Sequence, residues 1–146
     1  SNKARLVAQF ATEFQGLDSL PLAAELNRRL LATGRQLDVL IQVNSSGEDS
    51  KFGLPPAEVA GFAAALAPFD ALNVRGLMTL ALPSPDAEEV AACFRRLVQV
   101  QRELREAGVP GQSYDELSMG MSGDFELAIS HGATVVRIGT ALFGAR

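Results

Sequence analysis

The chain has 146 residues, of which 47% are hydrophobic and 21% charged, so it has enough apolar side chains for one packed domain. Its net charge of −4 and its scattered basic residues (eleven Arg, two Lys) argue against a nucleic-acid-binding surface. No apolar run is long enough to span a membrane, and the single cysteine, Cys93, excludes an internal disulfide. These features favour a cytoplasmic protein.

The apolar pattern predicts helices and strands that alternate along the chain. In chain order, the first half is expected to hold a helix over 2–13, a short strand over 14–18, a helix over 20–33, a strand over 37–44 and a helix over 55–67. The second half is expected to hold a strand over 72–80, a helix over 86–107, a strand over 116–119, a helix over 123–131 and a strand over 134–138.

This alternation is typical of parallel β/α units. Four of the strands are well marked, whereas the pattern at 14–18 is poor. A closed eight-stranded barrel needs about 200–250 residues. The sequence therefore predicts a single incomplete domain over residues 1–146, an α/β fold that forms part of a TIM barrel.

Two stretches near the C-terminus, 116–126 and 134–144, share one design. Each is a buried strand that breaks at glycine beside a hydroxyl residue and then turns into a helix. Backbone N–H groups at such a turn point outward and attract anions. Two successive turns of this kind predict the last loops of a β/α barrel, where a phosphate is commonly held.

The segments 117–124, 136–146 and 74–78 resemble those of the pyridoxal phosphate homeostasis proteins (the YggS/PROSC family), and so do Asn44 and the loop 49–53. The resemblance implies the last four to five β/α units of an alanine-racemase-like barrel, about the C-terminal two-thirds. The family's cofactor lysine belongs to the first strand, so the resemblance also implies that this lysine lies outside the chain.

Pyridoxal phosphate (PLP) is thus the expected cofactor, held without its covalent lysine. The implied cofactor-binding residues are Met121, Ser122, Arg137, Gly139, Thr140, Asn44 and Lys51. Ser122 and the turn at Gly139 and Thr140 would hold the phosphate, and Arg137 would lie at the ring nitrogen. No catalytic residue and no metal site are expected, because the one histidine, His131, has no nucleophile or metal-ligand partner in the pattern.

The residues alone leave other interpretations open. Ser122 and Thr140 are also suited to capping helices. Arg137, on an apolar strand, needs a partner, which could equally be a carboxylate such as Asp124 or Glu126. Lys51 fits a solvated loop lysine as well as a cofactor ligand.

The favoured function is a PLP-binding carrier in intracellular cofactor homeostasis, not an enzyme. The alternatives are a fragment of a PLP-dependent racemase and a non-binding assembly module. PLP, phosphate or sulfate is the expected ligand, with no nucleic-acid or membrane partner. Because a partial barrel exposes sheet edges, a homodimer or a swapped oligomer is also expected.

Overall fold

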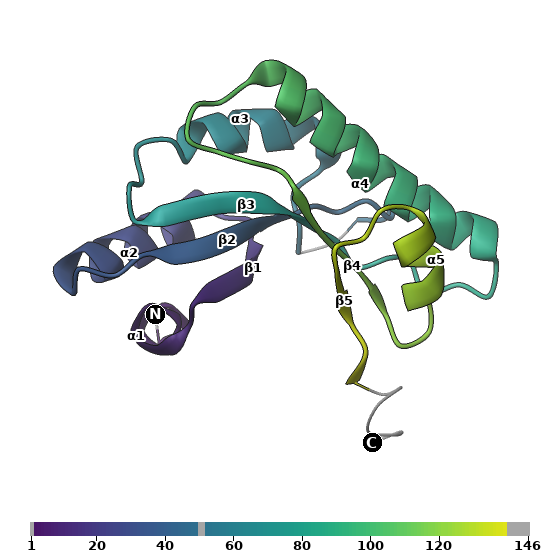
Figure 1. Cartoon of the computed structure of the whole chain (residues 1–146), viewed down its shortest axis with the longest axis horizontal. Coiled ribbons are helices and arrows are strands. Elements are labelled where there is room, and N and C mark those ends of the chain that lie inside the picture. The colour runs from purple at the N-terminus through teal and green to yellow at the C-terminus, as the bar shows by residue number, and fades with distance from the viewer. Residues whose placement is uncertain (1, 50–51, 140–146) are drawn as a thin grey trace.

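The computed structural model describes residues 2–49 and 52–139, and its centre is one curled parallel sheet (Figure 1). The five strands are β1 (Glu13–Leu17), β2 (Leu37–Gln42), β3 (Leu72–Met78), β4 (Glu116–Met121) and β5 (Val135–Arg137). They lie in the sheet in the order β1-β2-β3-β4-β5, and every neighbouring pair is parallel. Sequential order without a reversal is the winding of a β/α barrel, whereas a doubly wound sheet reverses its order at one point.

Helices separate the strands and cover the convex side of the sheet, where α3 and α4 lie across it (Figure 1). The helices are α1 (Asn2–Phe10), α2 (Leu20–Ala32), the 3₁₀ turn η1 (Pro56–Glu58), α3 (Val59–Ala65), α4 (Ala87–Ala107) and α5 (Phe125–Ser130). The main core forms between this layer and the sheet, and it includes Ile41, Leu77, Phe94, Leu97 and Met119, all fully buried. None of the helices within the described ranges has the length and apolar character needed to cross a bilayer.

Local sequence signals explain where the two longest helices begin and end. Ser19 caps α2 by accepting a hydrogen bond from the N–H of Leu22 (3.3 Å). Asp86 caps α4 in the same way through the N–H of Glu88 (2.9 Å). Gly108 ends α4 in the left-handed conformation, with φ of 64°, which suits a residue without a Cβ.

The sheet is curled strongly enough to bring β1 and β4 together on its concave side. Three strand spacings in a flat sheet would separate these strands by about 14 Å. Instead, the Oγ of Ser118 on β4 donates to the Oε1 of Gln15 on β1 at 2.6 Å. The sheet is therefore a half-barrel, as the alternation of elements predicts.

All ten predicted elements are present, but several bounds differ. The first helix ends at Phe10 rather than at 13, because the carbonyl of Thr12 already accepts the N–H of Asp38 on β2 (3.2 Å). The poorly marked strand at 14–18 is β1, with an irregular register between Phe14 and Leu17. The helix expected at 55–67 divides into η1 and α3.

Candidate functional site

The carboxyl ends of β4 and β5 lie side by side, because Met121 is paired in register with Arg137. Gly120 allows β4 to turn into α5, since it has φ of +104° and a Cβ there would lie 2.7 Å from the Cβ of Ala128. By contrast, a Cβ at Gly123 or Gly139 would meet nothing within 4 Å. The backbone is thus open at Gly123, and no described residue crowds Gly139.

Ser122 is not the N-cap of α5, so the capping interpretation is wrong for this residue. The helix begins at Phe125, and Asp124 occupies the N-cap position without a side-chain cap. The carboxylate of Asp124 instead accepts the N–H of Met121 (2.7 Å), while the N–H of Asp124 donates to the carbonyl of Met121 (3.1 Å). Asp124 therefore closes the β4–α5 turn that presents Ser122.

Arg137 is held on the concave side by neutral acceptors. Its Nη1 donates to the Oγ of Ser118 (2.6 Å) and to the Oε1 of Gln15 (3.3 Å), and its Nη2 donates to the carbonyl of Thr79 (3.0 Å). Within the described residues Arg137 forms no ion pair, so the alternative of a salt bridge to Asp124 or Glu126 is not realised. Hydrogen bonds to β1, to β4 and to the loop after β3 thus fix a guanidinium that has no carboxylate partner in the described part of the chain.

On the concave side of the sheet, carboxylates lie at the amino ends of the strands and Arg137 lies at the carboxyl ends. Burial lowers the pKa of Arg137, and the charge of Asp124 partly offsets this effect. At the amino ends of the strands, burial and the neighbouring carboxylates of Glu13 and Asp38 raise the pKa of Glu116. Carboxylates thus gather at the amino ends of the strands, where Arg75 pairs with Asp38 (3.4 Å), whereas the carboxyl ends hold Arg137.

A second buried network supports the carbonyl that Arg137 uses. The hydroxyl of Thr79 donates to the carbonyl of Val43 (2.8 Å) and lies 2.7 Å from the hydroxyl of Ser45. Arg96 on α4 donates to the carbonyl of Ser45 (2.6 Å). Thr79 and Ser45 are both fully buried, so these bonds replace water and tie the loops after β2 and β3 together.

Removing the Thr79 hydroxyl is expected to loosen this support. Thr79→Val keeps the side-chain shape but leaves the buried Ser45 hydroxyl without its partner, so we expect the free energy of unfolding to fall by about 1–3 kcal/mol. Thr33→Val is the matched control, because its hydroxyl is on the surface and its loss should cost no more than about 0.5 kcal/mol. Equal losses in urea unfolding of the two variants would contradict a structural role for Thr79.

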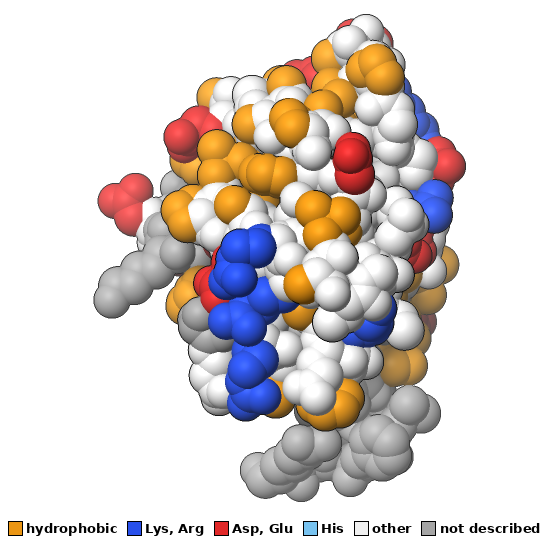
Figure 2. All heavy atoms as spheres, turned by 90° about the vertical axis from the view of Figure 1, so that its left-hand side faces the viewer, with side chains coloured by type: hydrophobic (Ala, Val, Ile, Leu, Met, Phe, Trp, Pro, Cys, Tyr) orange, Lys and Arg blue, Asp and Glu red, His pale blue; other side chains and the backbone are white. Residues whose placement is uncertain are grey.

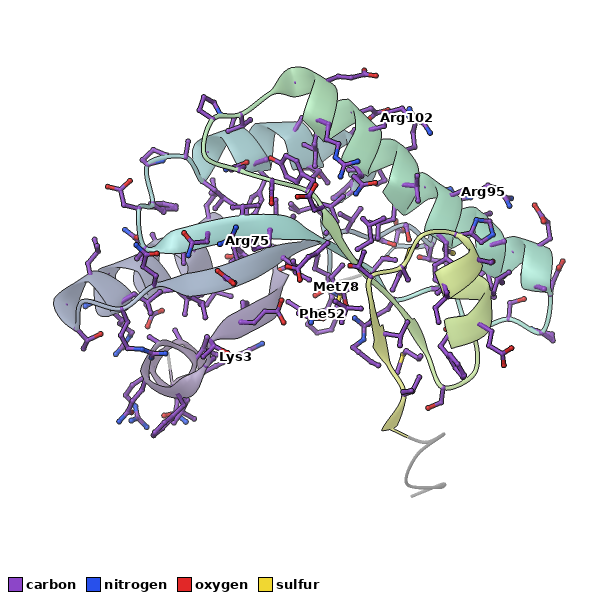
Figure 3. The ribbon with its side chains drawn as sticks, viewed as in Figure 1. Lys3, Phe52, Arg75, Met78, Arg95 and Arg102 are labelled. Carbon is purple, nitrogen blue, oxygen red and sulfur yellow. The ribbon has the colours of Figure 1, made fainter. Side chains whose placement is uncertain are left out.

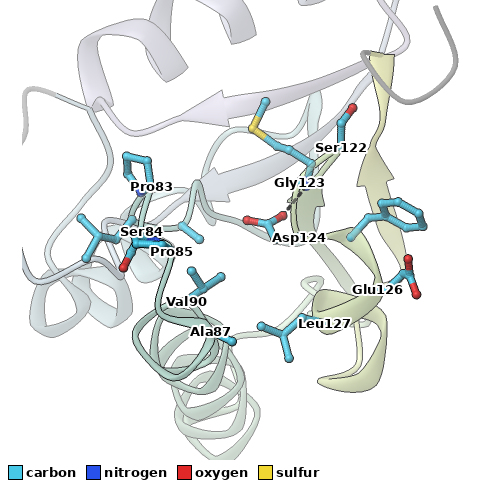
Figure 4. Close-up of a pocket in the computed structure, with 14 residues that line it drawn as sticks. Pro83, Ser84, Pro85, Ala87, Val90, Ser122, Gly123, Asp124, Glu126 and Leu127 are labelled. Carbon is cyan, nitrogen blue, oxygen red and sulfur yellow. Dashed lines mark hydrogen bonds between the residues drawn. The ribbon is translucent and has the colours of Figure 1, made fainter. Parts of the chain in front are cut away.

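A cavity of about 570 Å³ lies between the β3–α4 loop and the β4–α5 turn (Figure 4). Its lining is mostly apolar and includes Pro83, Val90, Met121 and Leu127. Figure 4 shows the Ser122 hydroxyl pointing away from Val90 and Leu127. Arg137 does not line this cavity. The Ser122 hydroxyl, which the sequence predicts to bind a phosphate, is thus directed away from the apolar side chains of the cavity.

The remaining expected residues are placed as follows. Asn44 organises its own loop, because its Nδ2 donates to the carbonyl of Glu48 (2.6 Å) and its Oδ1 accepts the hydroxyl of Ser46 (2.7 Å). Met121 lies half-exposed beside the cavity. Lys51 and Thr140 lie outside the described residues. Within those residues, no three His, Cys, Asp or Glu side chains gather as metal ligands.

Sequence reasoning missed Gln15, Ser118, Thr79 and Ser45. Gln15 and Ser118 were available as polar residues inside apolar strands, which is a signal for an inward-facing polar contact. Nothing local connects Thr79 with Ser45, because 34 residues separate them.

The fold is that of part of a β/α barrel, and the carboxyl end of its sheet holds the fixed guanidinium of Arg137 beside the β4–α5 turn. The family model described as "Alanine racemase, N-terminal domain" matches residues 3–146, and the chain belongs to this family. The resemblance to pyridoxal phosphate homeostasis proteins is confirmed as well: the chain is 41% identical over 146 residues to the protein of that name from Haemophilus influenzae.

Solved structures agree with this assignment. PipY of Synechococcus elongatus PCC7942, solved with PLP bound, matches 98% of this chain and 66% of its own, with a TM-score of 0.88 and 34% identity. An alanine racemase of Clostridium difficile 630 in complex with cycloserine shares the fold, with a TM-score of 0.81 over 99% of this chain and 39% of its own at 17% identity. The chain covers 61% of the length of the Haemophilus relative.

Proposed function

We propose that this chain supplies the phosphate-binding and ring-nitrogen-binding part of a PLP site, in a cytoplasmic protein that carries the cofactor rather than using it in catalysis. The observation that carries the proposal is the fixed position of the Arg137 guanidinium. Its guanidinium is fixed by Ser118, Gln15 and the carbonyl of Thr79, at the strand ends where Ser122 and Gly139 also lie. PipY, a relative with the same fold, has been solved with PLP bound.

The residues present fit the phosphate. Gly123, after β4, and Gly139, after β5, leave their backbone accessible. Ser122 carries a hydroxyl at the start of the β4–α5 turn. The amino ends of the strands carry carboxylates that disfavour an anion there. We therefore assign the phosphate to the space between the β4–α5 turn and the end of β5.

Arg137 suits the ring nitrogen, because a guanidinium has only donors and keeps its proton. A nitrogen that accepts from Arg137 stays unprotonated, so the ring withdraws electrons weakly. PLP, when bound, supplies an aldehyde that condenses reversibly with amines. Weak electron withdrawal favours holding the cofactor over breaking bonds in an attached amine, which supports the carrier function.

Ser122 provides the direct test of the phosphate assignment. We expect Ser122→Ala to weaken PLP binding by about 1–2 kcal/mol, because the phosphate loses one hydroxyl donor. Ser130→Ala is the matched control: its hydroxyl is exposed and donates within α5 to the carbonyl of Leu127 (2.6 Å). Calorimetric titration with PLP should separate the variants, and unchanged affinity in Ser122→Ala would refute the assignment.

The non-binding assembly module is the second candidate. The observation in its favour is that β1 and β5 each have a neighbour on one side only within the described part of the sheet. Self-association through these edges remains a prediction that sedimentation of the chain would check.

A further inference from the structure

A groove between α1 and α2, away from the carboxyl ends of the strands, gathers four arginines. It has a volume of about 430 Å³ and is lined by Arg5, Arg28, Arg29 and Arg35 together with small residues that include Ala8 and Ala32. Figure 2 shows a band of Lys and Arg side chains on the side of the molecule where α1 and the end of α2 lie. The whole chain carries a net charge of −4, so this concentration of positive charge is local.

Two of the four arginines have evident structural uses. Arg35 donates to the carbonyls of Ala8 and Ala11 and so satisfies the end of α1, with an Nη2–O distance of 2.6 Å to Ala11. Arg29 pairs with Glu25 one helical turn earlier (3.2 Å). Both guanidinium groups are therefore held in place at the wall of the groove.

The other two arginines have no carboxylate partner among the described residues. Arg5 donates only to the side-chain oxygen of Asn2 (2.9 Å), and Arg28 is exposed without an ion pair. No Asp or Glu lines the groove. The described lining of the groove thus carries four positive charges and no negative one, which favours an anionic ligand.

We propose that this groove binds a small molecule that carries two or more linked phosphate groups. The planar guanidinium forks match phosphate oxygens in pairs. The volume lies within the range of small-molecule sites, about 300–1,000 Å³. The groove is formed by residues of α1, of α2 and of the turn that follows α2.

The test is a titration of the ¹⁵N-labelled chain with inorganic pyrophosphate and, separately, with ATP, followed by amide chemical shifts. We expect saturable shifts at Ala8 and Ala32, and about tenfold weaker binding in Arg28→Gln and in Arg5→Gln. Arg102→Gln is the matched control, because Arg102 lies on α4 away from α1 and α2 and donates only to Gln99 (3.0 Å) (Figure 3). The affinity of Arg102→Gln for pyrophosphate and for ATP should equal that of the unaltered chain.

Three results would overturn the proposal. The first is the absence of saturable shifts in the groove, and the second is equal weakening by Arg102→Gln, which would mean nonspecific attraction. The third is saturable binding of a polyglutamate peptide while both phosphates fail, which would assign the groove to a protein partner. Shifts confined to Ser122 and Gly139 would contradict phosphate binding in the groove but would be compatible with the proposed PLP site. The experiment therefore tests the two sites separately.

Discussion

Replacing Gly76 with alanine is expected to lower the free energy of unfolding by about 3 kcal/mol. Gly76 on β3 pairs with Glu116 on β4, and a Cβ at this position would lie 1.8 Å from the carbonyl oxygen of Glu116. The atom in the way belongs to the backbone, so no side chain can rotate to make room. The two strands must separate, and that weakens the pairing that carries β4 and β5 to the site.

Gly61→Ala is the matched control for this prediction. Gly61 lies on α3, and a Cβ at this position would meet nothing within 4 Å, so alanine should stabilise the helix by about 0.5–1 kcal/mol. Chemical denaturation of both variants compares the same substitution at two positions. Similar changes in the two variants would show that β3 and β4 do not approach as closely as the structure indicates.

Replacing Arg137 with methionine is expected to weaken PLP binding by about 1.5–3 kcal/mol, roughly tenfold to a hundredfold, through loss of a charged donor to the ring. Affinity for inorganic phosphate should change less, because Ser122 and the backbone at Gly139 remain. The absorption spectrum of bound PLP should then respond to pH as the ring nitrogen becomes free to gain a proton.

Arg137→Lys separates charge from geometry. A lysine keeps the positive charge, but its single ammonium cannot bond Ser118 and the carbonyl of Thr79 in the way that two guanidinium nitrogens do. We expect it to recover little of the lost affinity. Unfolding measurements on both variants show whether the protein remains folded. Full PLP affinity in a folded Arg137→Met variant would place the ring elsewhere.

The sequence was most informative about local order. Alternating apolar runs predicted the strands and helices of the described residues, and the predicted bounds of the two longest helices, 20–33 and 86–107, differ from the observed ones by one residue. The strand at β1 was weakly marked because Gln15 and Gly16 interrupt its apolar pattern. The structure explains the interruption, since Gln15 bonds Ser118 across the concave side.

Contacts between distant segments could not be predicted in this way. The role of Gly76 depends on how closely β4 approaches, and glycine in a strand does not by itself identify its neighbour. The same is true of Arg5 and Arg28, which come from different helices and share a groove only after these helices pack. The sequence marked Arg137 as a residue that needs a partner, but its neutral partners follow from the curl of the sheet.

A paired titration would show whether the ends of β4 and β5 bind the phosphate of PLP. The ¹⁵N-labelled chain would be titrated with PLP and with pyridoxal, which lacks the phosphate, while amide shifts are followed. If the phosphate binds there, we expect saturable amide shifts at Ser122, Gly123 and Gly139 with PLP. The affinity for pyridoxal should be at least about tenfold weaker. Equal affinity for the two compounds, or shifts that leave these three residues unchanged, would contradict phosphate binding at these strand ends.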